Sequence, residues 1–293
     1  MSDLAYFLFN VFLPLFVGHV IVPPLNGGLT EKDVLINNKY LEDIVVLLQD
    51  LFTPPEFRSS SYVRENLCYP IQKGGVSYKN ITYMFVHESW NHMFRNLWGI
   101  FTTGNYLYKQ TKNSTNTVMT VYFVSGVVAI IPLKYDIKNW TKVDSSLFTK
   151  VVEQIKNISN INFINTQITG CGSSAGVFGL LGASSIFALS SIIRNTRKWI
   201  RTVQNHCRGK SPKTTFEIAC LVAASTVRIY SFSGVGLVLG SITFCLDIIK
   251  KHYDKANGVI ILDRTNHDAH FKGFLVGVGF GFWYISKSNR KVF

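Results

Sequence analysis

The sequence predicts an all-α, polytopic membrane protein whose six transmembrane helices form one bundle. Two observations carry this prediction. Only 16% of the 293 residues are charged and 47% are apolar, whereas about a quarter of a typical soluble domain is charged. The apolar residues are also gathered into six runs, each about long enough to cross, or nearly cross, a bilayer. These runs cover residues 4–25, 83–104, 118–133, 174–193, 232–249 and 271–285.

The first run is expected to remain in the protein as a helix. No lysine or arginine precedes it, and no small-residue cleavage pattern stands beside Pro23 and Pro24. It therefore lacks the features of a cleaved signal peptide. We expect a single membrane domain over residues 1–293, with a helical core over about 4–286 and a short tail at 287–293.

The second run contains polar side chains that are unusual in a membrane span. His87, His92 and Asn96 follow one another in its first half. His92 and Asn96 are four residues apart and share one helix face, and His87 lies a little over one turn before His92. Such groups are costly within a bilayer and usually face the bundle interior. They either hydrogen-bond neighbouring helices or share a chemical task in the outer half of the membrane.

The third run contains no charged residue and is about long enough to cross, or nearly cross, a bilayer. The fifth is less sharply defined, because the stretch 216–230 before it is also apolar, although Glu217 and Arg228 break it. That stretch is either an interfacial segment or a cytoplasmic extension of the fifth helix.

The fourth run opens with two serines among very small residues. Gly172, Gly176 and Gly179 recur at three- and four-residue spacing, so one helix face is nearly bare backbone that a neighbouring helix can approach closely. A hydroxyl at the mouth of this helix is either a packing contact or a nucleophile. Because a helix advances about 100° per residue, Ser173 and Ser174 are not expected to face the same neighbour.

The sixth run places a histidine just ahead of a pair of glycines. His270 is followed by Gly273 and Gly277, a small-residue pattern that permits close contact with a second small-residue helix, for which the fourth run is the obvious partner. The result is an imidazole and a hydroxyl at the ends of two tightly packed helices. A serine needs a base to become a nucleophile, and an imidazole supplies one near neutral pH.

The positive charge of the chain is distributed as a membrane topology requires. The net charge is +13, and lysine and arginine gather in loops on the cytoplasmic side of membrane proteins. The basic residues concerned are Arg194, Arg197, Lys198, Arg201, Arg208, Lys210 and Lys213 after the fourth run, Lys109 and Lys112 after the second, and Lys287, Arg290 and Lys291 in the tail. Both termini are therefore expected in the cytoplasm, and the pattern favours topology over nucleic-acid binding.

The loops expected on the outer side contain two of the five cysteines, Cys68 and Cys171. A disulfide between them is possible, but the odd cysteine total and the absence of a Cys-x-x-Cys spacing give no disulfide framework and no metal site. Sequons at Asn80, Asn139 and Asn157 also fall on this side. With no Arg-rich transit peptide present, the expected location is the secretory pathway or the plasma membrane.

Taken together, these residues resemble the rhomboid family of intramembrane serine proteases. The motif His-x4-His-x3-Asn of that family corresponds to His87, His92 and Asn96; Gly-x-Ser-Gly-x3-Gly corresponds to Gly172, Ser174, Ala175 and Gly179; and His-x2-Gly-x3-Gly corresponds to His270, Gly273 and Gly277. Ala175 stands where the family usually has glycine. The order of the motifs, their spans and their side of the membrane also match.

The resemblance implies a role for each of these positions. Ser174 and His270 would form a catalytic dyad that needs no aspartate. His92 and Asn96, with the backbone N–H of Ser174, would form the oxyanion hole, and His87 would support that helix. Phe178 would pack against the catalytic histidine. The substrates would be transmembrane proteins within the lipid bilayer, cleaved near its outer boundary, and no cofactor or metal is implied.

Two other functions remain open from the sequence. A catalytically inactive relative would use the same polar groups only to bind or sort membrane clients. A transporter would use the intramembrane histidines as a proton relay, although the chain lacks the paired acidic residues and interrupted inverted repeats typical of that class.

Overall fold

The computed structural model describes residues 2–25, 53–70, 77–130, 169–209, 214–220, 232–256 and 267–289, together with Leu47, Leu51 and Ala223. Its long helices form an all-α bundle, as the sequence predicts. In the part of the chain described, each of the six predicted runs contains a helix, although the bounds of the helices differ from those of the runs. Sequons Asn139 and Asn157 and much of the stretch 216–230 lie outside the described residues.

The first run forms one continuous helix, made of α1 (Asp3–Phe7), a π-helical turn at Leu8–Phe12 and α2 (Leu13–Ile21). The hydroxyl of Ser2 caps its start by accepting a hydrogen bond from the amide of Ala5. The wider turn lies just ahead of Pro14, which has no N–H to donate to the preceding turn. A π-helical turn accommodates that missing bond without ending the helix.

The second run departs from its prediction at the start. The helix α6 (Trp90–Gly99) begins seven residues later than expected and continues through a π-helical turn at Ile100–Gly104 into α7 (Asn105–Gln110). Its first turn is fixed by the hydroxyl of Ser89, which accepts a hydrogen bond from the amide of His92 at 3.2 Å. The preceding residues form α5 (Lys79–Thr82) and a 3-10 turn at Tyr83–Phe85. His87 therefore lies before the helix and not on it.

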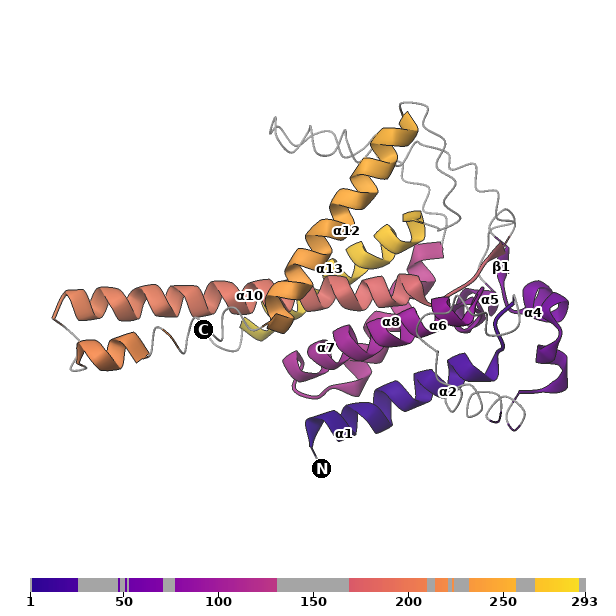
Figure 1. Cartoon of the computed structure of the whole chain (residues 1–293), viewed down its shortest axis with the longest axis horizontal. Helices are drawn as coiled ribbons and strands as arrows, with labels where there is room; N and C mark the ends of the chain where they lie inside the picture. The colour runs from indigo at the N-terminus through magenta and orange to yellow at the C-terminus, as the bar shows by residue number, and fades with distance from the viewer. Residues whose placement is uncertain are drawn as a thin grey trace.

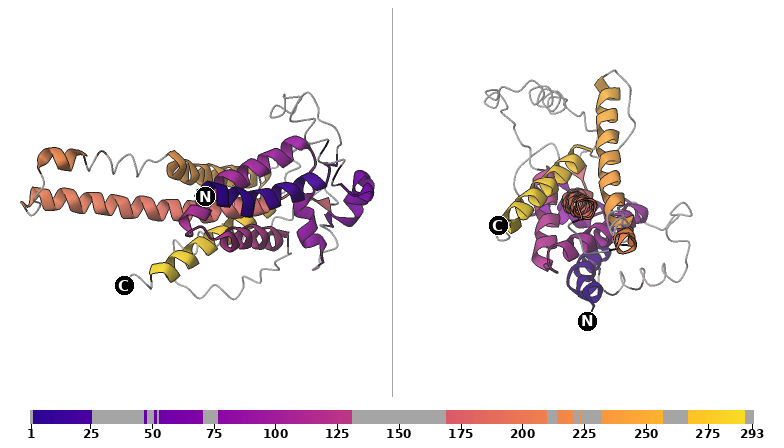
Figure 2. Two further views of the ribbon diagram at one scale, coloured as in Figure 1. Left: turned by 90° about the horizontal axis from the view of Figure 1, so that it is seen from below. Right: turned by 90° about the vertical axis from the view of Figure 1, so that its left-hand side faces the viewer.

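The remaining helices are α8 (Thr115–Ile130), α10 (Ser174–Cys207), α12 (Phe232–Ala256) and α13 (His267–Asn289). Figure 1 shows α10 as the longest helix, running through the bundle and projecting beyond it at one end, and Figure 2 shows it end-on among the other helices. Its 34 residues span about 50 Å. Because the hydrocarbon core of a bilayer is about 30 Å thick, α10 is longer than a single crossing requires, and its arginines and lysines lie in the second half of the helix.

At the other end of α10 the chain forms a small surface layer. It contains a 3-10 turn at Pro55–Arg58, the helix α4 (Ser60–Asn66) and a two-residue antiparallel ladder between β1 (Tyr69–Pro70) and β2 (Thr169–Gly170). β2 leads directly into Gly172, whose φ of +108° is a left-handed conformation. Only glycine adopts this conformation without strain, and it turns the chain into the first residue of α10.

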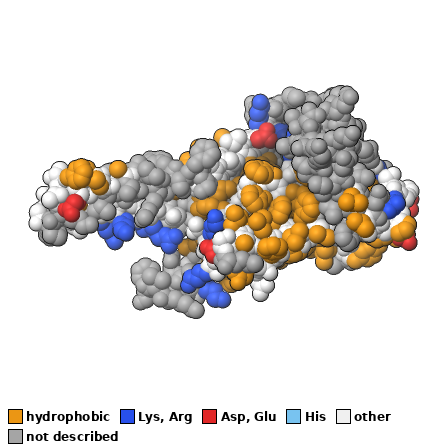
Figure 3. Space-filling view, turned by 60° about the horizontal axis from the view of Figure 1, so that its bottom comes forward, with side chains coloured by type: hydrophobic (Ala, Val, Ile, Leu, Met, Phe, Trp, Pro, Cys, Tyr) orange, Lys and Arg blue, Asp and Glu red, His pale blue; other side chains and the backbone are white. Residues whose placement is uncertain are grey.

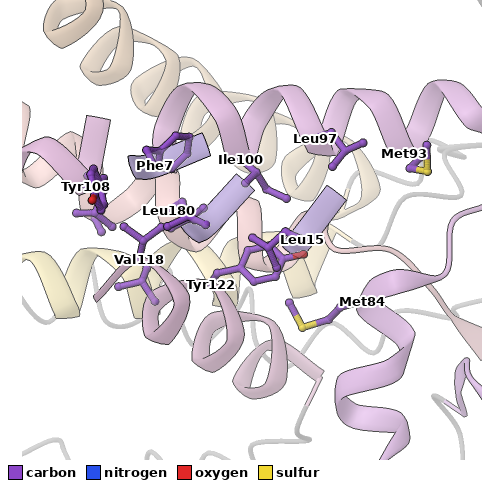
Figure 4. Close-up of a cluster of buried hydrophobic side chains, with 14 of the residues drawn as sticks. Phe7, Leu15, Met84, Met93, Leu97, Ile100, Tyr108, Val118, Tyr122 and Leu180 are labelled. Carbon is purple, nitrogen blue, oxygen red and sulfur yellow. The ribbon is translucent and has the colours of Figure 1, made fainter. Parts of the chain in front are cut away.

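The buried apolar side chains join α1, α2, α6, α7, α8 and α10 into one core, part of which is drawn in Figure 4. The fully buried members include Phe7, Leu15, Met84, Met93, Ile100, Leu107, Tyr122 and Leu180. They come from both sides of α10, so this helix is held on several faces.

Apolar side chains also cover much of the bundle on the face shown in Figure 3. Large exposed examples are Phe9, Leu13, Trp98, Leu189, Leu239, Ile242, Leu246, Ile249, Leu275, Phe282 and Trp283. An apolar surface of this extent faces lipid or another protein. Among the described residues, two helices, Asp3–Ile21 and Ser174–Cys207, are both long and apolar enough by composition to span a membrane, and Thr115–Ile130 is a shorter apolar helix.

Candidate active site

Ser174 and His270 are brought together although 96 residues separate them in the sequence. The hydroxyl oxygen of Ser174 lies 2.6 Å from Nε2 of His270, which is a short hydrogen-bond distance for these groups. Ser174 is the first residue of α10 and is partly exposed, while His270 stands in the first turn of α13 and is 9% exposed. The pair therefore sits at the edge of the bundle, at the end that carries the β1–β2 ladder.

Glycines set the distance between these two helices. A Cβ atom on Gly273 would lie 2.9 Å from the carbonyl carbon of Ala175, and one on Gly277 would lie 2.7 Å from that of Gly179. Both distances are shorter than the separation of about 3.5–4.0 Å at which non-bonded carbon atoms pack. Gly179 in turn contacts Ser125 of α8 on its other side. Bare backbone at these points is what allows the two side chains to meet.

An aromatic stack holds the imidazole of His270. The ring of Phe178 lies 4.6 Å from that of His270, centroid to centroid, at an interplanar angle of 31°. Phe178 also stacks on Phe244 of α12 at 4.1 Å and 22°. Three rings in a row restrict rotation of the histidine about its side-chain bonds, because any other orientation would lose these contacts.

The polar face of α6 approaches the start of α10. The ring of His92 lies against Gly172, where an added Cβ would be 2.7 Å from its Cε1 atom. Asn96 lies one turn further along α6 and is 5% exposed. Gly99 lies about one turn beyond Asn96 and contacts Val177 of α10. Asn96 lies between these two contacts on the same helix face. Within the described residues, its amide nitrogen has no hydrogen-bond partner, so a buried donor remains available beside the first turn of α10.

His87 is fully buried and lies behind this face. Its Nδ1 atom is 3.3 Å from the carbonyl oxygen of Phe85, and its Nε2 atom is 3.4 Å from the hydroxyl of Ser173. Its ring is 5.2 Å from that of His92. His87 thus connects the segment before α6 to the turn that carries Ser173 and Ser174.

The structure adds a buried polar network that the sequence reasoning missed. Nδ1 of His19, on α2, donates to the carbonyl oxygen of Leu15 at 2.6 Å, so its Nε2 atom accepts the hydroxyl of Ser173 at 3.1 Å. The hydroxyl of Tyr122, on α8, lies 3.2 Å from the same nitrogen and also hydrogen-bonds Ser173. His19 was the sequence signal that could have pointed to this network, because a histidine within an apolar run usually faces the bundle interior.

Ser173 and Ser174 thus face different partners. Ser173 is completely buried and is surrounded by His19, His87 and Tyr122, whereas Ser174 faces His270. Within the part of the chain that the structure describes, no group of three or more histidine, cysteine or acidic side chains is arranged to hold a metal ion.

Comparison with known proteins gives one match. The family model described as the rhomboid domain matches residues 75–287, which is well over half of the chain and includes Ser174, His270 and the polar face of α6. No curated protein and no solved structure matches the sequence. The family predicted from the three motifs is therefore confirmed, and the chain, an integral membrane protein, belongs to the rhomboid family.

Proposed function

We propose that the protein is an intramembrane serine endopeptidase that hydrolyses peptide bonds of transmembrane protein substrates near the outer membrane boundary. The rhomboid family includes proteases and inactive members. The observation that favours activity here is the 2.6 Å contact between the Ser174 hydroxyl and Nε2 of His270. An inactive member has no need of a nucleophile and a base in hydrogen-bond contact at an exposed edge of the bundle.

The proposed reaction begins with a proton transfer. Neutral His270 accepts the proton of Ser174 at Nε2 while the oxygen of Ser174 attacks the carbonyl carbon of the scissile peptide bond. The resulting tetrahedral intermediate collapses when the same nitrogen returns its proton to the leaving amine. The remaining ester between substrate and Ser174 is hydrolysed by a water that His270 deprotonates in the same way.

The negative oxygen of the intermediate needs donors that are already in place. The amide of Asn96 supplies one, since it is buried without a partner among the described residues. The backbone N–H of Ser174 supplies a second, because it belongs to the unpaired first turn of a 34-residue helix. His92, whose ring lies against Gly172, supplies a third. Prearranged donors of this kind stabilise the transition state more than the bound substrate.

The imidazole must keep its orientation without an aspartate beside it. We propose that the stack of Phe178 and Phe244 fulfils this role, because it fixes the plane of the His270 ring. His87, Ser173 and His19 hold the turn before Ser174 from the other side. The nucleophile is thus positioned by α2 and by the segment that precedes α6.

We also propose that both termini lie in the cytoplasm and that the catalytic pair faces the opposite side, in the secretory pathway or the plasma membrane. The side chain of Asn113, in the turn after Lys109 and Lys112, donates to the carboxylate of Asp3 at 2.8 Å. The N-terminus and this basic turn therefore share one end of the bundle. Lysine and arginine mark the cytoplasmic end, whereas Ser174 begins α10 at the other end.

A fluorophosphonate probe tests the proposed activity. Such a probe reacts only with a serine that has been activated as a nucleophile. The purified wild-type protein should be labelled covalently, and Ser174→Ala should not. Ser190→Ala is the matched control, since Ser190 lies on the same helix about 24 Å further along its axis; this variant should be labelled like the wild type.

The alternative, an inactive rhomboid that binds or sorts membrane clients, predicts a different result. In that case the wild type would bind a single-span protein but would neither react with the probe nor cleave that protein. Labelling that persists in Ser174→Ala would show that another residue is modified and would remove the support for the proposed dyad.

A further inference from the structure

Two cysteines flank the β1–β2 ladder. Cys68 immediately precedes β1, and Cys171 immediately follows β2. The ladder is antiparallel and pairs Tyr69 with Gly170 and Pro70 with Thr169, so continuing the register by one residue sets Cys68 opposite Cys171. Residues that face each other in an antiparallel pair have Cα atoms about 4.5–5.5 Å apart. Disulfides join residues whose Cα atoms are roughly 4.4–6.8 Å apart.

The two side chains also share one environment. Both belong to a small apolar cluster that contains Val22, Val63 and Val86, where Cys68 is 1% exposed and Cys171 is partly exposed. Both carry free thiols, and these form a hydrogen bond to each other. The two thiols are therefore neighbours, and the register of the ladder places their backbones within the range that a disulfide spans.

The hydrogen bond shifts the pKa values of the two thiols in opposite directions. The S–H of Cys171 donates to Cys68, which lowers the pKa of Cys68 from its ordinary value, and the positive charges of Arg64 and Lys79 lower it further. The same hydrogen bond raises the pKa of Cys171. Both groups lie in the loop layer outside the membrane-spanning helices. The charges of Arg64 and Lys79 do not depend on Cys171, so they still favour the thiolate of Cys68 after Cys171 has reacted, and the thiolate is the form that attacks in an exchange reaction.

We propose that Cys68 and Cys171 form a disulfide when the protein is made in an oxidising compartment. The oxidant is the disulfide of a thiol–disulfide oxidoreductase. Cys171, the more exposed thiol, first forms a mixed disulfide with it and releases one of its two sulfurs as a thiol. The thiolate of Cys68 then attacks the sulfur of Cys171 and displaces the second sulfur of the oxidant. Two thiols of this chain are oxidised to one disulfide, and the disulfide of the oxidant is reduced to two thiols, which take up both protons.

This inference rests on the membrane orientation proposed above, and it is independent of the proteolytic activity. The remaining cysteines provide the contrast. Cys207 is exposed at the far end of α10, Cys220 is exposed, and Cys245 lies within α12. None of these three flanks the ladder, and all of them should remain reduced.

The bond would hold the chain just ahead of the nucleophile. Cys171 stands three residues before Ser174, and the neighbouring amide of Gly172 already donates to the carbonyl oxygen of Tyr83 at 2.9 Å. A covalent link to Cys68 closes a loop of about 100 residues, and closing a long loop removes much of the freedom of the unfolded chain. The turn that carries Ser173 and Ser174 would then remain attached to the outer layer at temperatures that loosen the ladder.

The test counts thiols in protein expressed in the secretory pathway. Membranes are blocked with N-ethylmaleimide in denaturant, reduced, and then treated with a polyethylene-glycol maleimide that adds mass at each thiol released by reduction. Wild type should gain two tags, Cys68→Ser and Cys171→Ser should gain none, and the control Cys207→Ser should gain two. Peptide mapping without reduction should yield Cys68 and Cys171 in one cross-linked species.

Thermal unfolding supplies a second readout. Reduction should lower the unfolding temperature of the wild type by about 5 °C or more and leave that of the Cys68→Ser/Cys171→Ser double variant unchanged. If reduction releases no thiol from the wild type, the proposal is wrong. Because Ser174→Ala should gain two tags like the wild type, this test gives the same answer whether or not the protein is a protease.

Discussion

Replacing Gly273 by alanine should separate the proposed nucleophile from its base while leaving both residues intact. The added Cβ would lie 2.9 Å from the carbonyl carbon of Ala175 and 3.2 Å from its Cα atom. Non-bonded carbons pack at about 3.5–4.0 Å, and the atoms in the way belong to backbone that has no rotamer to change. We therefore expect α13 to move away from α10 by about 1 Å at this level.

The displacement acts directly on the proposed catalytic pair, because His270 lies one turn before Gly273 and Ser174 is adjacent to Ala175. The distance from the Ser174 hydroxyl to Nε2 of His270 is 2.6 Å and would increase to about 3.6 Å, which is outside hydrogen-bond range. A misplacement of about 1 Å costs on the order of 100-fold in rate. Gly273→Ala should therefore lower kcat about 100-fold with little change in KM.

The assay is cleavage of a single-span reporter by purified protein in proteoliposomes, with labelling by the fluorophosphonate probe in parallel. Gly279→Ala is the matched control, because a Cβ at this position of α13 meets no atom within 4 Å. The control should retain wild-type turnover. If Gly273→Ala folds with the wild-type unfolding temperature and turns over like Gly279→Ala, close packing of these helices does not position the dyad.

Three further predictions concern other parts of the molecule. Asn96→Ala should lower kcat by about 100- to 1,000-fold with KM unchanged; a higher KM at constant kcat would refute the oxyanion role. Ser173→Val should lower the free energy of unfolding by about 1–3 kcal/mol, because it leaves His19 and Tyr122 without their buried partner, yet it should still be labelled by the probe at low temperature; an unchanged unfolding temperature would contradict the network. In intact cells, exposed Cys207 should be protected from a membrane-impermeant maleimide and become reactive after permeabilisation; labelling of Cys207 in intact cells would reverse the proposed orientation.

The helices and the family were predictable from the sequence because both depend on local patterns. Apolar runs of membrane length predict the spans directly, since a helix that crosses a bilayer requires about 20 apolar residues. Glycines at three- and four-residue spacing report close helix contact, and Gly273 does meet the backbone of α10 as that spacing suggests. The rhomboid motifs combine these patterns with a few polar residues at fixed spacing.

The start of α6 was predicted wrongly because apolar content does not locate helix ends. Tyr83–Phe85 is also apolar, but the hydroxyl of Ser89 caps the helix and sets its first residue at Trp90. His87 therefore reaches Ser173 from an extended segment, which helical spacing alone does not reveal. The length of α10 was underestimated for a similar reason, since its second half is polar and continues as a helix beyond the apolar run.

The buried network around His19 was missed because its members are distant in the sequence. The bond from His19 to Ser173 joins residues 154 positions apart, and that from Tyr122 to His19 joins residues 103 apart. No short motif contains them. Only the packing of α2 and α8 around the first turn of α10 brings these groups within hydrogen-bond distance.

The central claim is that Ser174 and His270 act as one catalytic unit. The most direct measurement is the rate of cleavage of one reconstituted single-span substrate by wild type, Ser174→Ala, His270→Ala and the double variant. Each single variant should lose nearly as much activity as the double variant, because each lacks the same activated nucleophile. Substantial cleavage by either single variant, or losses in the two single variants that simply multiply in the double variant, would contradict the dyad.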